Sequence, residues 1–174
     1  MEHSPDIYNK DCQIYREGMK MEELIGEWIE KHPKDIEWFG GVKSITPHIT
    51  KEAQKSGDYT LTNVDGSFTI DVKQDVHLGK GNLLAEYYCY YSSGYKGKGW
   101  MLYGKYDYIV FVAPASEIFY VVDFPKYKQA VLDYVVKNGF DVKTTLIQRV
   151  KGKKMWSVLI PEEECLDCWM KYYF

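Results

Sequence analysis

Two aspartates and one lysine flank a predicted β-hairpin, and these residue types hold metal ions and phosphates in many enzymes. Asp58 begins the first predicted strand, and Asp71 and Lys73 alternate along the second. The pair Asp65-Gly66 between the strands suits the central positions of a two-residue type I′ turn. With that turn, we expect Asp58 to lie directly opposite Lys73.

The alternation of side chains along both strands predicts that the charged groups share one face. This polar face holds Asp58, Thr60, Thr62, Thr69, Asp71 and Lys73, with Thr60 opposite Asp71. The other face holds Tyr59, Leu61, Phe68, Ile70 and Val72, and it needs a hydrophobic core. The hairpin therefore gathers two carboxylates and one amine on a single surface.

Two chemical interpretations of this cluster are open. Neighbouring carboxylates repel one another unless a cation neutralises them, and Mg²⁺ is commonly held by one or two carboxylates, water and phosphate oxygens. A metal there would activate a bound water, while Lys73 could orient or deprotonate that water or stabilise the phosphate. In the alternative, Asp58 and Lys73 form an ordinary cross-strand ion pair worth about 0–1 kcal/mol.

A helix is expected ahead of the hairpin, over residues 11–32. Its apolar side chains recur at three- and four-residue spacing. They are Ile14, Met21, Leu24, Ile25 and Trp28. Pro33 ends the helix, because the residue before proline avoids helical geometry. Glu22 lies at the edge of the apolar stripe, where a side chain can reach a neighbouring cleft.

The remaining pattern predicts a single α+β domain spanning residues 1–174, built on one mixed or mostly antiparallel sheet flanked by helices. Strands are expected at 83–91, 107–113, 117–124, 142–150 and 154–160, and helices at 125–137 and 161–169. Residues 35–45 fit either a strand or a short helix. No repeat, linker or low-complexity segment divides the chain.

The order of these motifs resembles the PD-(D/E)XK nuclease superfamily, whose fold is restriction-endonuclease-like. In that family an acidic residue begins one strand and an acid-x-lysine follows on the next, as Asp58 and Asp71-Val72-Lys73 do here. Residues 21–25 (Met-Glu-Glu-Leu-Ile) resemble the family's Gly-Glu-x-Leu-Ala stretch, and residues 99–101 and 105–110 resemble a segment of small bacterial and phage members. The resemblance covers a core of about residues 11–137, followed by a C-terminal hairpin and helix at 140–174. The chain departs from the pattern at Gly57, which replaces a proline, and at Asp71, which replaces the more frequent glutamate.

The resemblance implies hydrolysis of nucleic-acid phosphodiester bonds with Mg²⁺ or Mn²⁺, and an endonuclease with DNA as the expected substrate. Asp58 and Asp71 would be metal ligands, with the Val72 carbonyl as a third. Lys73 would position the nucleophilic water, and Glu22 would bind metal or water.

The resemblance also implies partners. Lys96, Lys98 and Lys105 are candidates for phosphate contacts, and small nucleases of this kind often act as homodimers. The rival hypothesis is a non-catalytic module on the same fold that binds nucleic acid or a protein through an aromatic surface.

Composition excludes some classes of protein. The 174-residue chain has a formal net charge of −3, so a strongly basic nucleic-acid binder is not indicated. No signal peptide or membrane-spanning run is expected, which predicts a cytoplasmic protein with no membrane partner. Cys165 and Cys168 form a C-x-x-C without a matching second pair of ligands, so packed thiols are favoured over a zinc site. The 16 tyrosines and five tryptophans suit a core, a stacking surface or an interface equally well.

Overall fold

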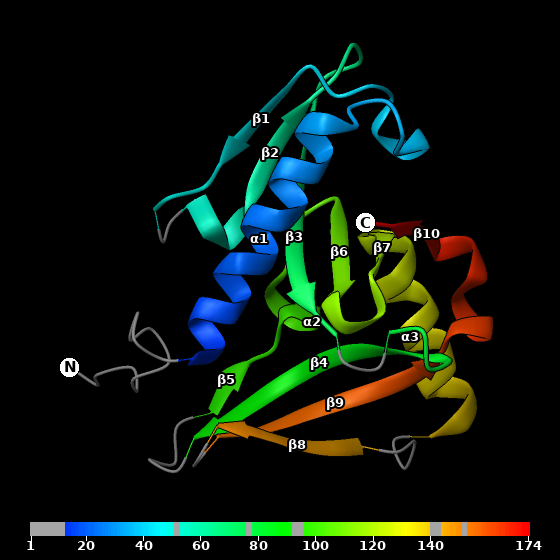
Figure 1. The fold of residues 1–174 in the computed structure, drawn as a ribbon. Coiled ribbons are helices and arrows are strands. Elements are labelled where there is room, and N and C mark those ends of the chain that lie inside the picture. Colours follow the sequence, from blue (N-terminus) through cyan, green and yellow to red (C-terminus); the bar gives the residue numbers. More distant parts are fainter. Residues whose placement is uncertain (1–12, 51–52, 76–77, 92–95, 140–143, 151–152) are drawn as a thin grey trace.

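The computed structural model describes residues 13–50, 53–75, 78–91, 96–139, 144–150 and 153–174, and their strands form two sheets (Figure 1). The larger is a six-stranded mixed sheet in which β3 and β6 are parallel and all other neighbours are antiparallel. Its strands are, in spatial order, β1 (Ser44–Pro47), β2 (Tyr59–Thr62), β3 (Ser67–Gln74), β6 (Tyr108–Ala113), β7 (Ile118–Asp123) and β10 (Trp169–Tyr173). The smaller is an antiparallel sheet with the order β5 (Lys96–Lys98), β4 (Asn82–Tyr91), β9 (Lys153–Pro161) and β8 (Thr144–Val150).

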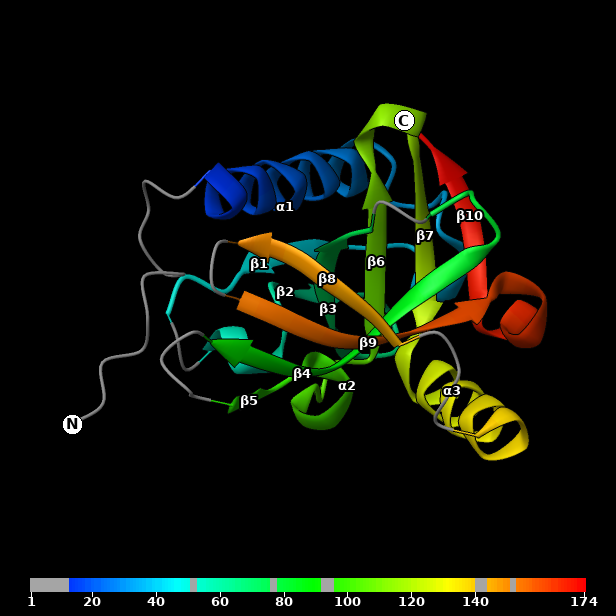
Figure 2. The same cartoon turned by 90° about the horizontal axis from the view of Figure 1, so that it is seen from below.

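Helices cover both faces of the larger sheet. The α-helices are α1 (Gln13–Lys31), α2 (Trp100–Tyr103) and α3 (Phe124–Asn138). Short 3₁₀ helices are η2 (Glu37–Phe39), η3 (Ala53–Ser56), η4 (Pro114–Ser116) and η5 (Glu162–Cys168). Figures 1 and 2 show α1 and α3 on opposite sides of β6 and β7. The fold is therefore α+β, as the sequence predicts.

Two hydrophobic cores lie on either side of the six-stranded sheet. On one side Ile25 and Ile29 of α1 pack with Ile70 and Val72 of β3. On the other side α2, α3, η5 and the smaller sheet pack against the opposite faces of β6 and β7. Because β6 and β7 are buried on both faces, their sequences are almost entirely apolar and do not alternate between apolar and polar residues.

The predicted register of the hairpin is wrong by two residues. Tyr59 pairs with Ile70 and Thr60 with Thr69, so Asp58 approaches Asp71 rather than Lys73. The cause is Asn63, whose backbone N–H donates to the Gly66 carbonyl and whose side-chain oxygen accepts from two backbone N–H groups of the turn. The turn is thus centred one residue earlier than the predicted type I′ turn. Because the shift is an even number of residues, every side chain keeps its predicted face.

Other differences come from contacts that are distant in sequence. The separate second sheet was not predicted, because it forms when β4 pairs with β9 across more than 60 residues, for example Ala85 with Val158. The predicted C-terminal hairpin is present in it as β8 and β9. The helix predicted at 161–169 is instead η5, and the chain then enters β10, which pairs with β7. Residues 35–45, left open by the sequence, form η2 and the start of β1. In the described part of the chain, no helix has the length and apolar character needed to cross a membrane.

Candidate functional site

The candidate site lies where β3 extends beyond its neighbour β2. Strand β2 begins at Tyr59, but β3 continues to Gln74, so the second half of β3 has no β2 partner. Asp58 bridges this gap, because its N–H donates to the Ile70 carbonyl at 2.8 Å and its Oδ2 accepts from the Val72 N–H at 2.7 Å. The Asp58 carboxylate is therefore fixed beside the Asp71-Val72-Lys73 segment.

The backbone before Asp58 requires glycine. Gly57 has φ +110°, and a Cβ added to it would lie 2.4 Å from the Ile70 carbonyl oxygen. The imidazole of His48 holds the same corner, with Nδ1 2.8 Å from the Gly57 carbonyl oxygen and Nε2 2.8 Å from the Thr60 hydroxyl. A carbonyl only accepts, so Nδ1 is the donor. Sequence reasoning missed His48, because a lone histidine ten residues before an aspartate carries no recognisable signal.

Asp71 and Lys73 form the centre of the site. Asp71 is buried, and its Oδ2 lies 2.5 Å from the Lys73 Nζ. The buried carboxylate and the ammonium thus form a close ion pair. The Lys73 Nζ also donates to the Val72 carbonyl at 3.4 Å. Among the described residues Lys73 thus pairs with Asp71, and not with Asp58 as the ordinary cross-strand alternative expects.

Helix α1 brings Glu22 to this site. The Tyr59 hydroxyl donates to the backbone carbonyl of Glu22 at 3.0 Å, which ties the helix to the first residue of β2. Gly26 allows this approach, since a Cβ there would lie 2.9 Å from the Tyr59 hydroxyl oxygen. One turn along the helix, Ile25 is fully buried in the core behind β3. Glu22 consequently stands at the edge of the buried face, as the helical pattern predicts.

The four charged side chains interact strongly. Burial raises the pKa of Glu22 to about 7, with further increases from Asp58 and Asp71 and a decrease from Lys73. Burial also raises the pKa of Asp71 to about 6, with Lys73 acting against it and Asp58 adding to it. For Lys73, burial lowers the pKa, but the carboxylates of Asp71 and Asp58 outweigh burial and hold it above its usual value. Three carboxylates thus surround one ammonium, so a single positive charge does not balance the negative charge of the ionised acids.

This donor set fits a hard divalent cation in its chemistry. Mg²⁺ and Mn²⁺ prefer carboxylate and carbonyl oxygens, which Glu22, Asp58, Asp71 and the Val72 carbonyl supply. The uncompensated negative charge of the three acids also favours a cation. Within the described residues, however, no three His, Cys, Asp or Glu side chains already stand close enough together to share an ion.

The sequence also assigned phosphate contacts to Lys96, Lys98 and Lys105. Lys98 and Lys105 have exposed side chains. Lys96 begins β5, but its side chain lies outside the described residues. Sequence reasoning missed the short helix α2, which has too few residues to show a period. Tyr106, which follows α2, is buried, and its hydroxyl acts on Asp71.

The C-x-x-C thiols lie elsewhere, in η5. Cys165 and Cys168 are free and buried. Burial raises the pKa of Cys165 to about 12, and its Sγ lies 3.6 Å from the carbonyl oxygens of Pro161 and Glu162. A thiol with so high a pKa is a poor nucleophile, and both cysteines pack in the hydrophobic core, which agrees with two packed thiols.

Comparisons with known proteins give no independent identification. No family model, no curated protein and no solved structure matches this chain. The functional argument therefore depends on the geometry and chemistry of the site.

Proposed function

We propose that this protein is a divalent-metal-dependent endonuclease of the PD-(D/E)XK type that hydrolyses phosphodiester bonds, with DNA as its substrate. One observation carries the proposal: Glu22 of α1, Asp58 just before β2, and Asp71 and Lys73 of β3 are brought together at the open end of β2. An ordinary surface hairpin has no reason to bury Asp71 beside a second aspartate and a glutamate.

The arrangement of the elements supports the restriction-endonuclease-like part of the proposal. A long helix with a glutamate precedes the hairpin, and the acid-x-lysine lies on the hairpin's second strand. That strand then pairs in parallel with β6, which makes it internal to the sheet. An internal strand is a rigid support for catalytic side chains. Homodimer formation and cytoplasmic location stay predictions of the sequence.

In the proposed mechanism, Asp58, Asp71 and the Val72 carbonyl would hold Mg²⁺ or Mn²⁺, and Glu22 would hold the metal or its water. Such an ion, when bound, lowers the pKa of a coordinated water and neutralises charge on the phosphoryl oxygens. The Lys73 ammonium, held by Asp71, donates hydrogen bonds to the attacking water or to the scissile phosphate. The Asp58 bond to the Val72 N–H keeps the carboxylate and the Val72 carbonyl in a fixed relation.

A non-catalytic binding module is the second candidate. Two contacts favour it: the Lys73 ammonium partly neutralises the buried Asp71 carboxylate, and Asp58 accepts the Val72 N–H, both without any ligand. In that case the acids would stabilise the end of β2, and the protein would bind nucleic acid or a protein without cutting.

A substrate panel separates the two candidates. The protein is incubated with circular, linear and branched DNA and with RNA, in Mg²⁺, Mn²⁺ or EDTA, alongside Asp71→Asn and Lys73→Ala. Metal-dependent cleavage that both variants lose would support the nuclease. Cleavage that persists in EDTA or in Lys73→Ala would rule out the mechanism, and binding without cleavage of any substrate would favour the binding module.

A further inference from the structure

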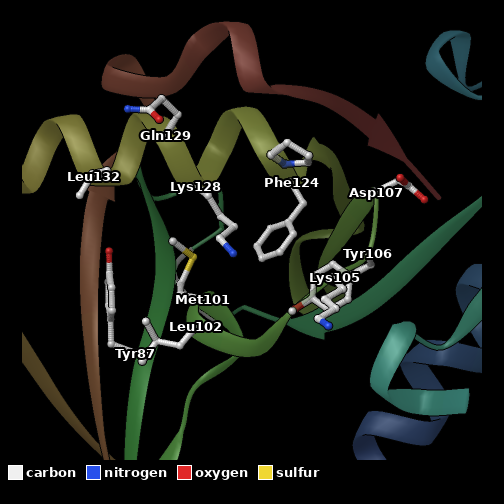
Figure 3. A pocket seen from close by; sticks show the side chains of 12 residues that line it. Tyr87, Met101, Leu102, Lys105, Tyr106, Asp107, Phe124, Lys128, Gln129 and Leu132 are labelled. Atoms are coloured by element: carbon white, nitrogen blue, oxygen red, sulfur yellow. The ribbon is translucent and has the colours of Figure 1, made fainter. Parts of the chain in front are cut away.

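A cavity of about 600 Å³ opens between β4, α2 and α3, next to the candidate site (Figure 3). Its walls are mainly apolar and aromatic, and they include Tyr87, Met101, Tyr106, Phe124 and Leu132. Tyr87 reaches this wall from a β-bulge, because the register of β4 against β9 shifts between Glu86 and Tyr88. Cavities of this size and character are typical of sites for small organic groups.

The cavity and the candidate site share structural elements. Met101 and Leu102 of α2 line the cavity, and the chain continues past Tyr106 into β6, whose Ile109 pairs with Asp71 of the site. Tyr106 belongs to both, because it lines the cavity and its hydroxyl acts on Asp71. A ligand in the cavity would therefore lie one short helix away from the four charged residues.

Positive charge lies at the cavity. Lys105 and Lys128 line it, and the Lys128 Nζ stands 5.1 Å from the centre of the Phe124 ring. The acid that lines it, Asp107, is directed elsewhere: its Oδ2 accepts from the N–H and the hydroxyl of Thr69 at 2.7 and 3.1 Å. Figure 3 shows the Asp107 carboxylate pointing away from both lysines. The cavity is thus basic in a chain whose formal net charge is −3.

We propose that this cavity receives an unpaired nucleobase of a single-stranded nucleic acid, with Lys105 and Lys128 contacting the phosphates beside that base. Tyr106 and Phe124 are buried in the core, so the half-buried Tyr87 supplies the ring on which a base stacks, while the lysines neutralise phosphates. The cavity is open to solvent on one side, but a base that is paired and stacked inside a duplex cannot turn its face toward the cavity wall, so the ligand must be unpaired. This inference rests on the proposed function and narrows its substrate to nucleic acid with unpaired nucleotides near the scissile phosphate.

The test measures binding in EDTA, where no metal-dependent cleavage occurs. A single-stranded DNA of about 12 nucleotides containing 2-aminopurine, and the same sequence as a duplex, are titrated with the protein. Fluorescence anisotropy reports affinity, and 2-aminopurine quenching reports stacking.

Two variants are compared with the wild type. One is the double variant Lys105→Ala/Lys128→Ala, and the other is Leu132→Glu, at a half-exposed position of α3 that tolerates a charge. Lys137→Ala is the matched control, since Lys137 lies on the same helix but pairs with Glu164 outside the cavity. Thermal melting checks that each variant is folded.

We expect the wild type to prefer the single strand and to quench 2-aminopurine. The double lysine variant should bind the single strand about tenfold more weakly. Its plot of log K against log[salt] should be less steep by about 1.4, because each lost phosphate contact accounts for about 0.7. Leu132→Glu should lose quenching and about five- to hundredfold in affinity, since stacking of one base is worth that much. Lys137→Ala should match the wild type.

Several results would overturn the proposal. The first is equal affinity of all variants for the single strand, and the second is no binding to the single strand at all. The third is a wild-type dimer in size-exclusion chromatography that Leu132→Glu dissociates, because the cavity would then be a protein interface. Cleavage assays in Mg²⁺ separate this proposal from the nuclease itself. If the protein cuts and the cavity variants bind normally, only the cavity proposal fails. If binding follows the expectation but no substrate is cut, only the nuclease fails.

Discussion

Replacing Lys73 with methionine tests whether the acids of the site repel one another as the geometry implies. Methionine keeps an apolar stem of similar length in the sheet but removes the ammonium that lies 2.5 Å from the Asp71 Oδ2. Asp71 is only 4 % exposed, so its carboxylate would be left buried without its partner. Glu22 and Asp58 would remain as uncompensated neighbours.

The expected loss of stability follows from this geometry. Removing one partner of a buried ion pair costs about 3–5 kcal/mol. Because the Lys73 side chain is 31 % exposed, water screens part of the interaction, and we expect a loss of about 2–3 kcal/mol near pH 8. The pKa of Asp71, raised from 3.8 to about 6 in the wild type, must rise further without Lys73. A carboxyl with a raised folded-state pKa destabilises the protein above that pKa, and this effect disappears as the pH falls toward the unfolded-state value. The loss should therefore shrink below about 1 kcal/mol near pH 5.

Urea denaturation followed by tryptophan fluorescence, in EDTA between about pH 5 and 8, measures this dependence. Lys31→Met is the matched control, since Lys31 pairs with Glu27 on the exposed face of α1, and its removal should cost about 0–0.5 kcal/mol at any pH. A loss in Lys73→Met that is independent of pH, or no larger than that of Lys31→Met, would refute the reasoning.

Three further predictions concern the supports of the site and the thiols. Tyr59→Phe removes the hydrogen bond that anchors α1, so the free energy of unfolding should fall by about 1 kcal/mol. The Mg²⁺ affinity, measured by calorimetry, should fall as well. An unchanged Mg²⁺ affinity would show that Tyr59 does not support the site. Gly57→Ala should destabilise the protein by more than about 2 kcal/mol in thermal melting, because both its φ of +110° and the close Ile70 carbonyl oppose a Cβ. Gly41→Ala, with φ +79° and open space around it, should cost only about 1 kcal/mol, and equal losses would contradict the argument. Cys165 and Cys168 should react with a thiol reagent only as fast as the protein unfolds; rapid reaction in the native state would contradict their burial.

The sequence predicted local features of the site better than its surroundings. The face shared by Asp58, Asp71 and Lys73 was correct because it depends only on the period of a strand. The position of Glu22 on α1 followed from helical periodicity in the same way. The register was wrong because Asn63 organises the turn with its side chain, an option that the Asp65-Gly66 signal concealed.

The surroundings depend on contacts between residues far apart in sequence. Nothing local indicates that β10 pairs with β7, or that β3 pairs in parallel with β6. The cavity could not be predicted for the same reason, since Tyr87 and Leu132 approach it from different elements. The family resemblance implied phosphate contacts by Lys96, Lys98 and Lys105, whereas the structure places Lys105 and Lys128 at the cavity.

The most direct test of the central claim is the single-turnover rate of cleavage as Mg²⁺ is titrated, for the wild type and for Asp71→Asn. The account predicts a cleavage rate that rises with Mg²⁺ concentration, saturates, and is abolished by EDTA. In Asp71→Asn the rate should fall at least about a thousandfold, which is the order of loss when a group that stabilises the transition state is removed. It also predicts that the Mg²⁺ needed for half-maximal rate increases as the pH falls below about 7, because protons then compete with the metal for Glu22. A rate that is independent of Mg²⁺, or equal in Asp71→Asn, would contradict the claim that these residues form a metal-dependent nuclease site.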